Sequence, residues 1–224
     1  MNRVNLNFIV IAFIITLTAC EKNQETLSGS VSEINAFVLE GNEYNDRIDV
    51  VKLLVNSERR YDAANEKNVW EGVEVAKSDY RNGSFSIKLP DDISNLNPFD
   101  IALPPKINIS NKNVSYSNSN LIAYNKDGEQ VGYFYYVCYK EEMMEAESGL
   151  CYFNNDFTIT GTDTETDEWG TTYIIYDCNF KKGWNFIYWH GNRPDGKGNR
   201  IDKTTTSVTG SMYWLFRANN DPGC

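Results

Sequence analysis

Hydrophobic and polar residues alternate along most of this chain, with the period of two that is typical of β-strands with one buried face. Residues 34–38, 84–89 and 131–139 show it most clearly, since every second residue there is apolar or aromatic. The pattern returns at 174–180, 184–188 and 208–216. We therefore expect an all-β protein.

Short turn sequences separate these runs and favour hairpins. They include Arg81-Asn82-Gly83, Lys126-Asp127-Gly128 and Lys182-Gly183. We expect Gly83 and Gly183 to adopt positive φ in tight turns. Two polar stretches, 57–68 and 141–147, are candidates for short helices.

The alternation lapses between residues 91 and 106. This stretch and its edge contain Pro90, Pro98, Pro104 and Pro105, and proline cannot serve inside a sheet ladder. The sequence therefore predicts two β-sandwich-like modules, residues 27–103 and 104–224.

The amino-terminal segment has the layout of a bacterial secretory signal, in which Arg3 precedes an uncharged apolar stretch at 8–17. That stretch is shorter than the roughly 20 apolar residues that a transmembrane helix needs. It ends in Leu17-Thr18-Ala19-Cys20, which resembles the lipobox of bacterial lipoproteins. The resemblance implies a diacylglyceryl group on Cys20, cleavage before it and N-acylation of the new terminus. Residues 1–19 would then be the signal peptide and 20–26 a lipidated tether; a signal that merely ends in cysteine is the alternative.

The net charge of the chain limits the kinds of partner that it can bind. Its 224 residues carry a formal net charge of −10, and loss of residues 1–19 would remove one further cation. An acidic protein repels phosphate backbones and anionic headgroups, so we expect no nucleic-acid partner. The membrane would be held by the lipid on Cys20.

Four cysteines remain after Cys20, and they allow three pairings. They are Cys138, Cys151, Cys178 and Cys224. No C-x-x-C motif is present and the chain has one histidine, so disulfides in an oxidising envelope are favoured over a zinc site. We expect Cys138 to pair with Cys151, and Cys178 with Cys224. The alternative is that Cys138 and Cys178 are reduced thiols of the core.

Four stretches resemble uncharacterised secreted lipoproteins of the Bacteroidota. They are residues 44–53 (YNDRIDVVKL), 80–90 (YRNGSFSIKLP), 158–162 (TITGT) and 181–185 (KKGWN). The resemblance implies immunoglobulin-like or transthyretin-like β-domains on an outer-membrane lipoprotein, with no assigned activity. Glu21 and Glu25 are a weaker form of the acidic tag associated with surface export in these bacteria, so the periplasmic and the surface-exposed face both stay open.

Two polar features are candidates for chemistry. Asp163, Glu165 and Asp167 share one side of an extended strand and are possible Ca²⁺ ligands. The run lacks the glycine and spacing of an EF-hand, and a solvated hairpin tip is the alternative, so we expect no metal or other cofactor. His190 is either a general base or a hydrogen-bonded residue at a strand end.

Aromatic residues offer a third possibility. With the tyrosines, four tryptophans either form a sugar-stacking platform or fill the core: Trp169, Trp184, Trp189 and Trp214. No catalytic constellation is readable, so we expect a non-enzymatic binding module for a glycan or protein ligand. The alternative is a structural subunit of a surface polymer that exchanges an edge strand between chains. A glycan hydrolase is the third hypothesis, although spacing along strands cannot assign its paired carboxylates.

Overall fold

The computed structural model describes residues 30–40, 46–63, 67–100, 102–140, 143–194, 199–208 and 210–219. These residues form strands and loops with no α-helix among them, which confirms the all-β class. The strands are β1 (Glu33–Glu40), β2 (Val50–Asp62), β3 (Lys67–Asp79), β4 (Ser84–Lys88), β5 (Asn97–Pro98), β6 (Asn108–Ile109), β7 (Ser115–Tyr124), β8 (Gln130–Lys140), β9 (Met143–Phe153), β10 (Phe157–Asp167), β11 (Gly170–Phe180), β12 (Gly183–Pro194), β13 (Arg200–Thr205) and β14 (Ser211–Ala218).

The β3–β4 connection is a two-residue hairpin. Asn82 and Gly83 have φ values of 51° and 77°, the signs required by a type I′ turn. The backbone N–H and C=O groups of Arg81 and Ser84 bond to one another at 2.9 and 3.0 Å. The alternation of β4 follows, because Phe85 and Ile87 point into the core while the residues between them face solvent.

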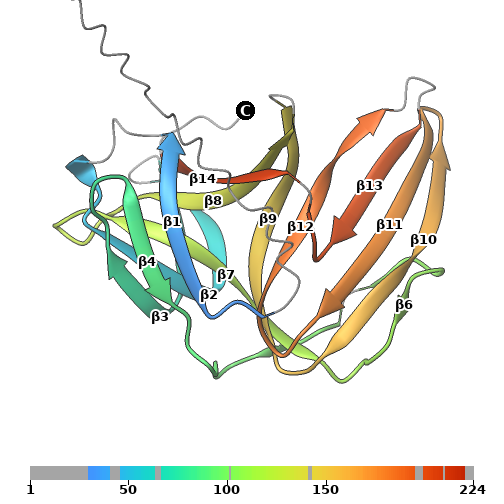
Figure 1. Cartoon of the computed structure of the whole chain (residues 1–224), viewed down its shortest axis with the longest axis horizontal. Helices are drawn as coiled ribbons and strands as arrows, with labels where there is room; N and C mark the ends of the chain where they lie inside the picture. The colour runs from blue at the N-terminus through green and yellow to red at the C-terminus, as the bar shows by residue number, and fades with distance from the viewer. Residues whose placement is uncertain are drawn as a thin grey trace, which may run out of the picture.

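A first hydrophobic core lies inside the strands β4-β1-β14-β8-β7-β2-β3, which wrap around the left half of the molecule in Figure 1. The ring of strands returns on itself because the hairpin brings β3 beside β4, where Ser86 N donates to Ser78 Oγ at 3.4 Å. Its buried side chains include Val51, Leu53, Ile87, Phe134 and Trp214. β1 and β14 run parallel with Val38 opposite Trp214, so strands from the two ends of the chain are neighbours.

A second, smaller core lies under β9-β12-β13-β11-β10-β6, on the right of Figure 1. Phe153, Phe157 and Phe180 form its centre, with ring centroids 4.6–4.9 Å apart. Such aromatic pairs contribute about 0.5–1.5 kcal/mol each beyond the area they bury. Phe99 and Leu103, from the proline-containing connection, pack against this core.

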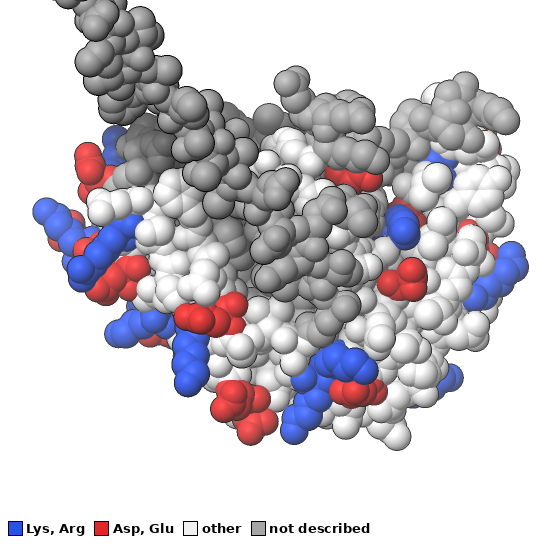
Figure 2. Space-filling model, viewed as in Figure 1, with Lys and Arg blue, Asp and Glu red and all other residues white. Residues whose placement is uncertain are grey.

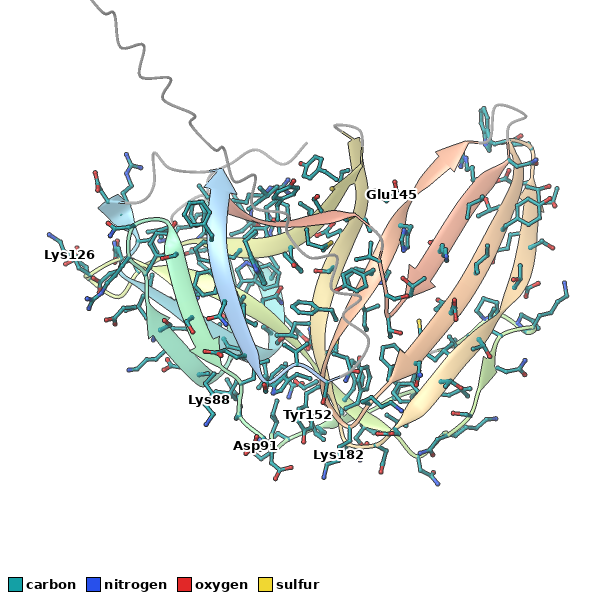
Figure 3. All side chains as sticks on the ribbon, in the orientation of Figure 1. Lys88, Asp91, Lys126, Glu145, Tyr152 and Lys182 are labelled. Carbon is teal, nitrogen blue, oxygen red and sulfur yellow. The ribbon has the colours of Figure 1, made fainter. Side chains whose placement is uncertain are left out.

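Strands β9 and β12 separate the two cores. Tyr152 and Trp184 belong to the first core, whereas Cys151 and Phe153 belong to the second. β9 extends through the molecule from Glu145 near one end to Tyr152 near the other (Figure 3). Both faces are covered along residues 150–153 of β9, which read accordingly as a continuous apolar run, Leu-Cys-Tyr-Phe.

The predicted boundary between residues 103 and 104 does not separate two sheets. β2, before it, pairs with β7, after it, from Val50 opposite Tyr124 to Val55 opposite Ser119. The first core also takes side chains from both sides of the boundary. The proline-containing stretch is a connection that packs on both cores, with Ile93 and Leu96 against the first and Phe99 and Leu103 against the second.

The two helix candidates are wrong where the chain is described. Residues 57–62 and 67–68 belong to the β2–β3 hairpin, and residues 143–147 belong to β9. The backbone N–H and C=O groups of these polar segments form hydrogen bonds with neighbouring strands. The segments have no apolar stripe that would stabilise a helix.

The buried face of β8 is the opposite of what the alternating pattern suggests. Phe134 and Cys138 enter the first core, while Tyr133 and Tyr135 lie on the other face and are only partly buried. Both faces of this strand are rich in apolar and aromatic residues, so the pattern alone does not choose between them. The face of β8 that carries Tyr133 and Tyr135 is therefore accessible to a ligand.

Candidate functional site

A junction of three strands forms the floor of the candidate site. β7 pairs with β9 through Tyr116–Ser119 and with β8 through Leu121–Tyr124, whereas β8 and β9 pair directly only from Tyr136 and Ser148 onward. A cavity of about 40 Å³ remains where the strands diverge, which is room for a few water molecules. Its lining includes Asn120, Leu121, Tyr135, Gly149, Leu150 and Trp214.

Trp189 lies beside this junction. It is opposite Glu147 in the β9–β12 register, and its six-membered ring fills the space above Gly149. The indole is held against the sheet there because position 149 has no side chain. Trp189 is nevertheless 45% exposed, so part of the ring is accessible to solvent.

The tyrosines of β8 extend this aromatic surface. The ring centroids of Tyr133 and Tyr135 are 6.0 Å apart, and Trp70 of β3 packs edge-on against Tyr133 at 5.5 Å. Tyr135 borders the same cavity as Gly149, so the row leads from β3 across β8 toward Trp189. We call Trp70, Tyr133, Tyr135 and Trp189 the aromatic strip.

A bend in the β2–β3 hairpin brings Trp70 to this face. The pairing register shifts between Val55 and Glu58, and Asn56 has a φ of 48°. Side chains of β7 hold the bend, since Asn118 Nδ2 donates to Ser57 O at 3.0 Å and Asn120 Nδ2 donates to Ser57 Oγ at 2.8 Å.

Gln130 secures the position of Trp70 on β8. Its Oε1 accepts a hydrogen bond from Trp70 N at 2.7 Å, and its Nε2 donates to Trp70 O at 2.6 Å. This amide pairs with the strand edge as another backbone segment would. The tryptophan is therefore tied to the strip by its main chain as well as by its ring.

Arg217 of β14 is the cation of the site. Its Nη1 donates to Tyr133 Oη at 3.3 Å, and its guanidinium lies 5.2 Å from the centroid of the Tyr135 ring, a favourable cation–π position. Desolvation, the largest effect, lowers the pKa of Arg217, but the hydrogen bond with Tyr133 and the charges of Tyr133, Tyr135 and Glu147 outweigh it and raise the pKa. No carboxylate of the described residues forms a salt bridge with Arg217.

Trp189 is the one predicted tryptophan that belongs to the strip. Trp184 and Trp214 are 2% and 8% exposed and fill the first core, where Trp184 Nε1 donates to Pro90 O at 2.8 Å. Trp169 is 71% exposed, but it lies at the turn between β10 and β11. Sequence reasoning missed Trp70, Arg217 and Glu147 because only the pairing of distant strands places them on one surface with Trp189. The local signal was Gly149, since a glycine inside a strand often marks the close approach of another group.

The predicted bond between Cys138 and Cys151 is wrong. Cys138 is opposite Ala146, and Cys151 is five residues further along β9, which is about 17 Å away and on the other face. A disulfide requires Cα atoms within roughly 7 Å. Cys151 is a buried free thiol, and burial raises its pKa to about 12.

The second predicted bond pairs Cys178 with Cys224. Cys178 is also a buried free thiol, and its Sγ donates to Thr204 O at 3.4 Å. Desolvation raises its pKa to about 12, so the alternative of a reduced core thiol describes Cys178. Cys224 lies outside the described residues, as does the predicted lipidation site Cys20.

Both turn glycines have the expected backbone. Gly83 has a φ of 77° and Gly183 a φ of 101°. The turn before Gly183 is held by Asp156, whose Oδ1 accepts from Lys182 N at 2.7 Å. That hydrogen bond, followed by the one from Lys181, lowers the pKa of Asp156.

The three acidic Ca²⁺ candidates have separate surroundings. Asp163 is buried and forms a salt bridge of 3.0 Å with Lys106; the hydrogen bond from Lys106 is the main cause of its lowered pKa. Glu165 is exposed, and Asp167 accepts from Trp169 N in the hairpin turn. Nowhere in the described part of the chain do three His, Cys, Asp or Glu side chains gather at a spacing suited to a metal ion.

His190 lies at the end of the β12 face that carries Tyr188. Its Nε2 is 3.1 Å from Thr205 Oγ1, and this hydroxyl donates to Ser207 O. The imidazole therefore donates to the threonine. Desolvation, followed by the charge of Lys203, lowers the pKa of His190, and the neutral ring serves here to fix a strand end.

Comparisons with family models, with curated proteins and with solved structures give no match. Within the described ranges, no helix is long and apolar enough to cross a membrane. The site itself therefore carries the functional argument.

Proposed function

We propose that this chain is a lipid-anchored protein of the bacterial cell envelope that binds a carbohydrate through the aromatic strip, without catalysing a reaction. The anchor is the lipid on Cys20 of an outer-membrane lipoprotein, and the lipobox resemblance supports it. Nucleic acid is not a partner in this proposal because of the negative net charge.

The position of Trp189 is the observation that carries the proposal. Sugars present apolar C–H faces and a rim of hydroxyls, and an aromatic ring fixed in place offers the matching apolar surface at little entropic cost. Trp189 is fixed by the space above Gly149 and remains 45% exposed. Tyr133, Tyr135 and Trp70 lengthen the surface beyond a single sugar ring.

Hydrogen-bonding groups surround these rings, as a carbohydrate requires. Glu147 is opposite Trp189 and is exposed, and Arg217 stands over Tyr135. On the face shown in Figure 2, the visible acidic and basic side chains are interspersed around the edge, as is typical of the surface of a soluble domain.

The finer description of the fold also belongs to the proposal. We propose that the two halves, each with its own core, are sandwich-like modules of the immunoglobulin or transthyretin type that share β9 and β12. The resemblance to Bacteroidota lipoproteins and the two separate clusters support this description.

A glycan array probed with the full-length protein, purified in detergent, tests the function. The wild type should bind a defined set of glycans, and Trp189→Ala should lower the affinity by about thirtyfold, as loss of a central aromatic contact does. Trp169→Ala is the matched control, because it removes a more exposed tryptophan outside the strip. If the array shows no bound glycan, or if both variants bind equally well, the proposal is wrong.

Strand-mediated assembly is the second candidate. Phe37 of β1 is 66% exposed and lines a shallow depression of about 490 Å³ with Asp79, Arg81 and Ser86. A large exposed aromatic side chain is a feature of association surfaces. Sedimentation of the wild type and of Phe37→Ser should then give a polymer and a monomer respectively, and a monomeric wild type would exclude assembly.

A further inference from the structure

We propose that Arg217 makes the strip selective for sugars that carry a carboxylate, such as uronic acids. This inference rests on the proposed function and names the ligand class of that site. It arises from the surroundings of Arg217. Several lysines of the described residues form salt bridges with carboxylates, whereas Arg217 forms none.

The guanidinium of Arg217 has donors to spare. A guanidinium carries five N–H groups, and the described side chains offer it one hydrogen bond, from Nη1 to Tyr133 Oη at 3.3 Å. Lys52, Lys106 and Lys181, by contrast, each form a salt bridge. Arg217 therefore retains both the charge and the parallel N–H groups that bind a carboxylate in bidentate fashion.

The position of Arg217 is fixed before any ligand arrives. The Tyr135 ring lies beneath its guanidinium at 5.2 Å, and the aliphatic stem is partly buried on β14. A cation that is already oriented loses less side-chain entropy on binding than a flexible lysine does.

The strand register sets the separation of Arg217 and Trp189. Val137 is opposite Glu147, which is opposite Trp189, whereas Arg217 is opposite Tyr133, four residues before Val137 and about 14 Å along the strand. The Trp189 ring leans back over Gly149 toward the Tyr135 side. An oligosaccharide with one sugar stacked on the indole can thus extend along the aromatic strip and direct the carboxylate of a neighbouring sugar to Arg217, which lies over Tyr135.

The charge of Glu147 opposes an anionic ligand, but weakly. Its side chain is exposed, so water and salt screen its charge. The bidentate contact with Arg217 outweighs this repulsion. Removal of the Glu147 charge should therefore strengthen binding of the acidic sugar.

Matched pairs of ligands test the inference with the full-length protein. Titration calorimetry compares hexameric oligogalacturonate with the same oligomer after reduction of its carboxyl groups, and sialyllactose with lactose. We expect the acidic member of at least one pair to bind about tenfold more tightly at low salt, with the difference shrinking as salt is added.

Variants assign this preference to Arg217. Arg217→Gln should bring the affinity ratio of the pair close to one, because it weakens binding of the acidic ligand more than binding of the neutral one, and Glu147→Gln should raise the affinity for the acidic ligand. Lys203→Gln is the matched control: it removes one positive charge from the opposite face of the sheet, since Lys203 is opposite His190. Circular dichroism checks that each variant is folded. Arg217→Lys keeps the positive charge but lacks the parallel N–H groups of the guanidinium, so it should retain part of the preference.

Three outcomes overturn the inference. A wild type that binds both members of each pair equally, or only the neutral ones, refutes it and leaves the proposed function standing. If the preference survives Arg217→Gln, or if Lys203→Gln lowers it equally, the preference for the acidic ligand comes from the net charge of the protein and not from Arg217. A wild type that binds no glycan at all refutes the proposed function together with the inference.

Discussion

The ring of Trp189 occupies the space that a side chain at Gly149 would need. A Cβ atom built on Gly149 would meet Trp189 Cη2 at 2.5 Å and Cζ3 at 2.9 Å, closer than real Cβ atoms approach. The indole of Trp189 on β12 can therefore lie across the strand junction only because the residue beneath it on β9 is a glycine.

Substitution of Gly149 should displace the tryptophan. We expect Gly149→Val to lower the glycan affinity by about thirtyfold, as Trp189→Ala does, and to lower the free energy of unfolding by about 1–3 kcal/mol through overpacking. Tryptophan fluorescence and denaturant unfolding measure the two effects. In the double variant Gly149→Val/Trp189→Ala the clash is gone, so most of the stability should return; strictly additive losses would contradict the contact.

The two turn glycines should resist replacement by β-branched residues. Gly83→Val and Gly183→Val should each lower the free energy of unfolding by about 1–2 kcal/mol, because φ values of 77° and 101° strain such a side chain. Gly191→Ala is the control, since nothing lies within 4 Å of the added Cβ, and it should stay within about 0.5 kcal/mol. An unchanged denaturant midpoint for Gly183→Val would refute the claim for that turn.

The buried thiols should make the fold sensitive to alkaline pH. Burial raises the pKa of Cys151 and Cys178 from 9.0 to about 12, so above pH 9 the unfolded chain loses these protons while the folded chain keeps them. The stabilisation is complete below pH 9 and declines toward pH 12, by up to about 1.4 kcal/mol per pH unit for each thiol.

Denaturant midpoints of the wild type and of Cys151→Ala between pH 8 and pH 10.5 measure this effect. The variant should be less stable at pH 8, because it leaves a cavity, but its midpoint should fall less steeply with pH. Equal slopes, or rapid modification of Cys151 by a thiol reagent in the folded protein, would contradict the buried thiol.

Lipidation at Cys20 should be visible in the mass of the mature protein. The membrane fraction of the wild type should contain a chain that begins at Cys20 and carries acyl groups, and two or more acyl chains make membrane binding stable. Cys20→Ser should give soluble protein or an uncleaved precursor. A mature amino terminus without any acyl mass in the wild type refutes the anchor.

Local sequence patterns predicted the strands in which one face is apolar and the other is polar. Phe85 and Ile87 alternate with serine and lysine, so only one face of β4 is suited to the core, and Asn82-Gly83 adopts the backbone of its turn from residue type alone. In β8 both faces are aromatic, and the side that packs inward depends on β1 and β14, which are far away in sequence. The alternation of β8 therefore did not decide which of its faces enters the first core.

The cysteines show the same limit. Cys138 and Cys151 are close in sequence, and a hairpin bond between them is plausible until the register of β8 and β9 is known. That register, which places them on opposite faces, is decided by the packing of two cores against one strand. The pairing of cysteines could not be derived from their spacing.

The sequence by itself determined the β class, the positive-φ turns and the candidate lipobox, because each follows from a few neighbouring residues. Only the tertiary structure decided that β1 pairs with β14, that β9 and β12 divide two cores, and that Trp189 meets Gly149 at the cavity that Tyr135 also lines. These relationships join strands up to about 180 residues apart in the chain, and they depend on long-range pairing and on which faces become buried, which local propensity does not specify.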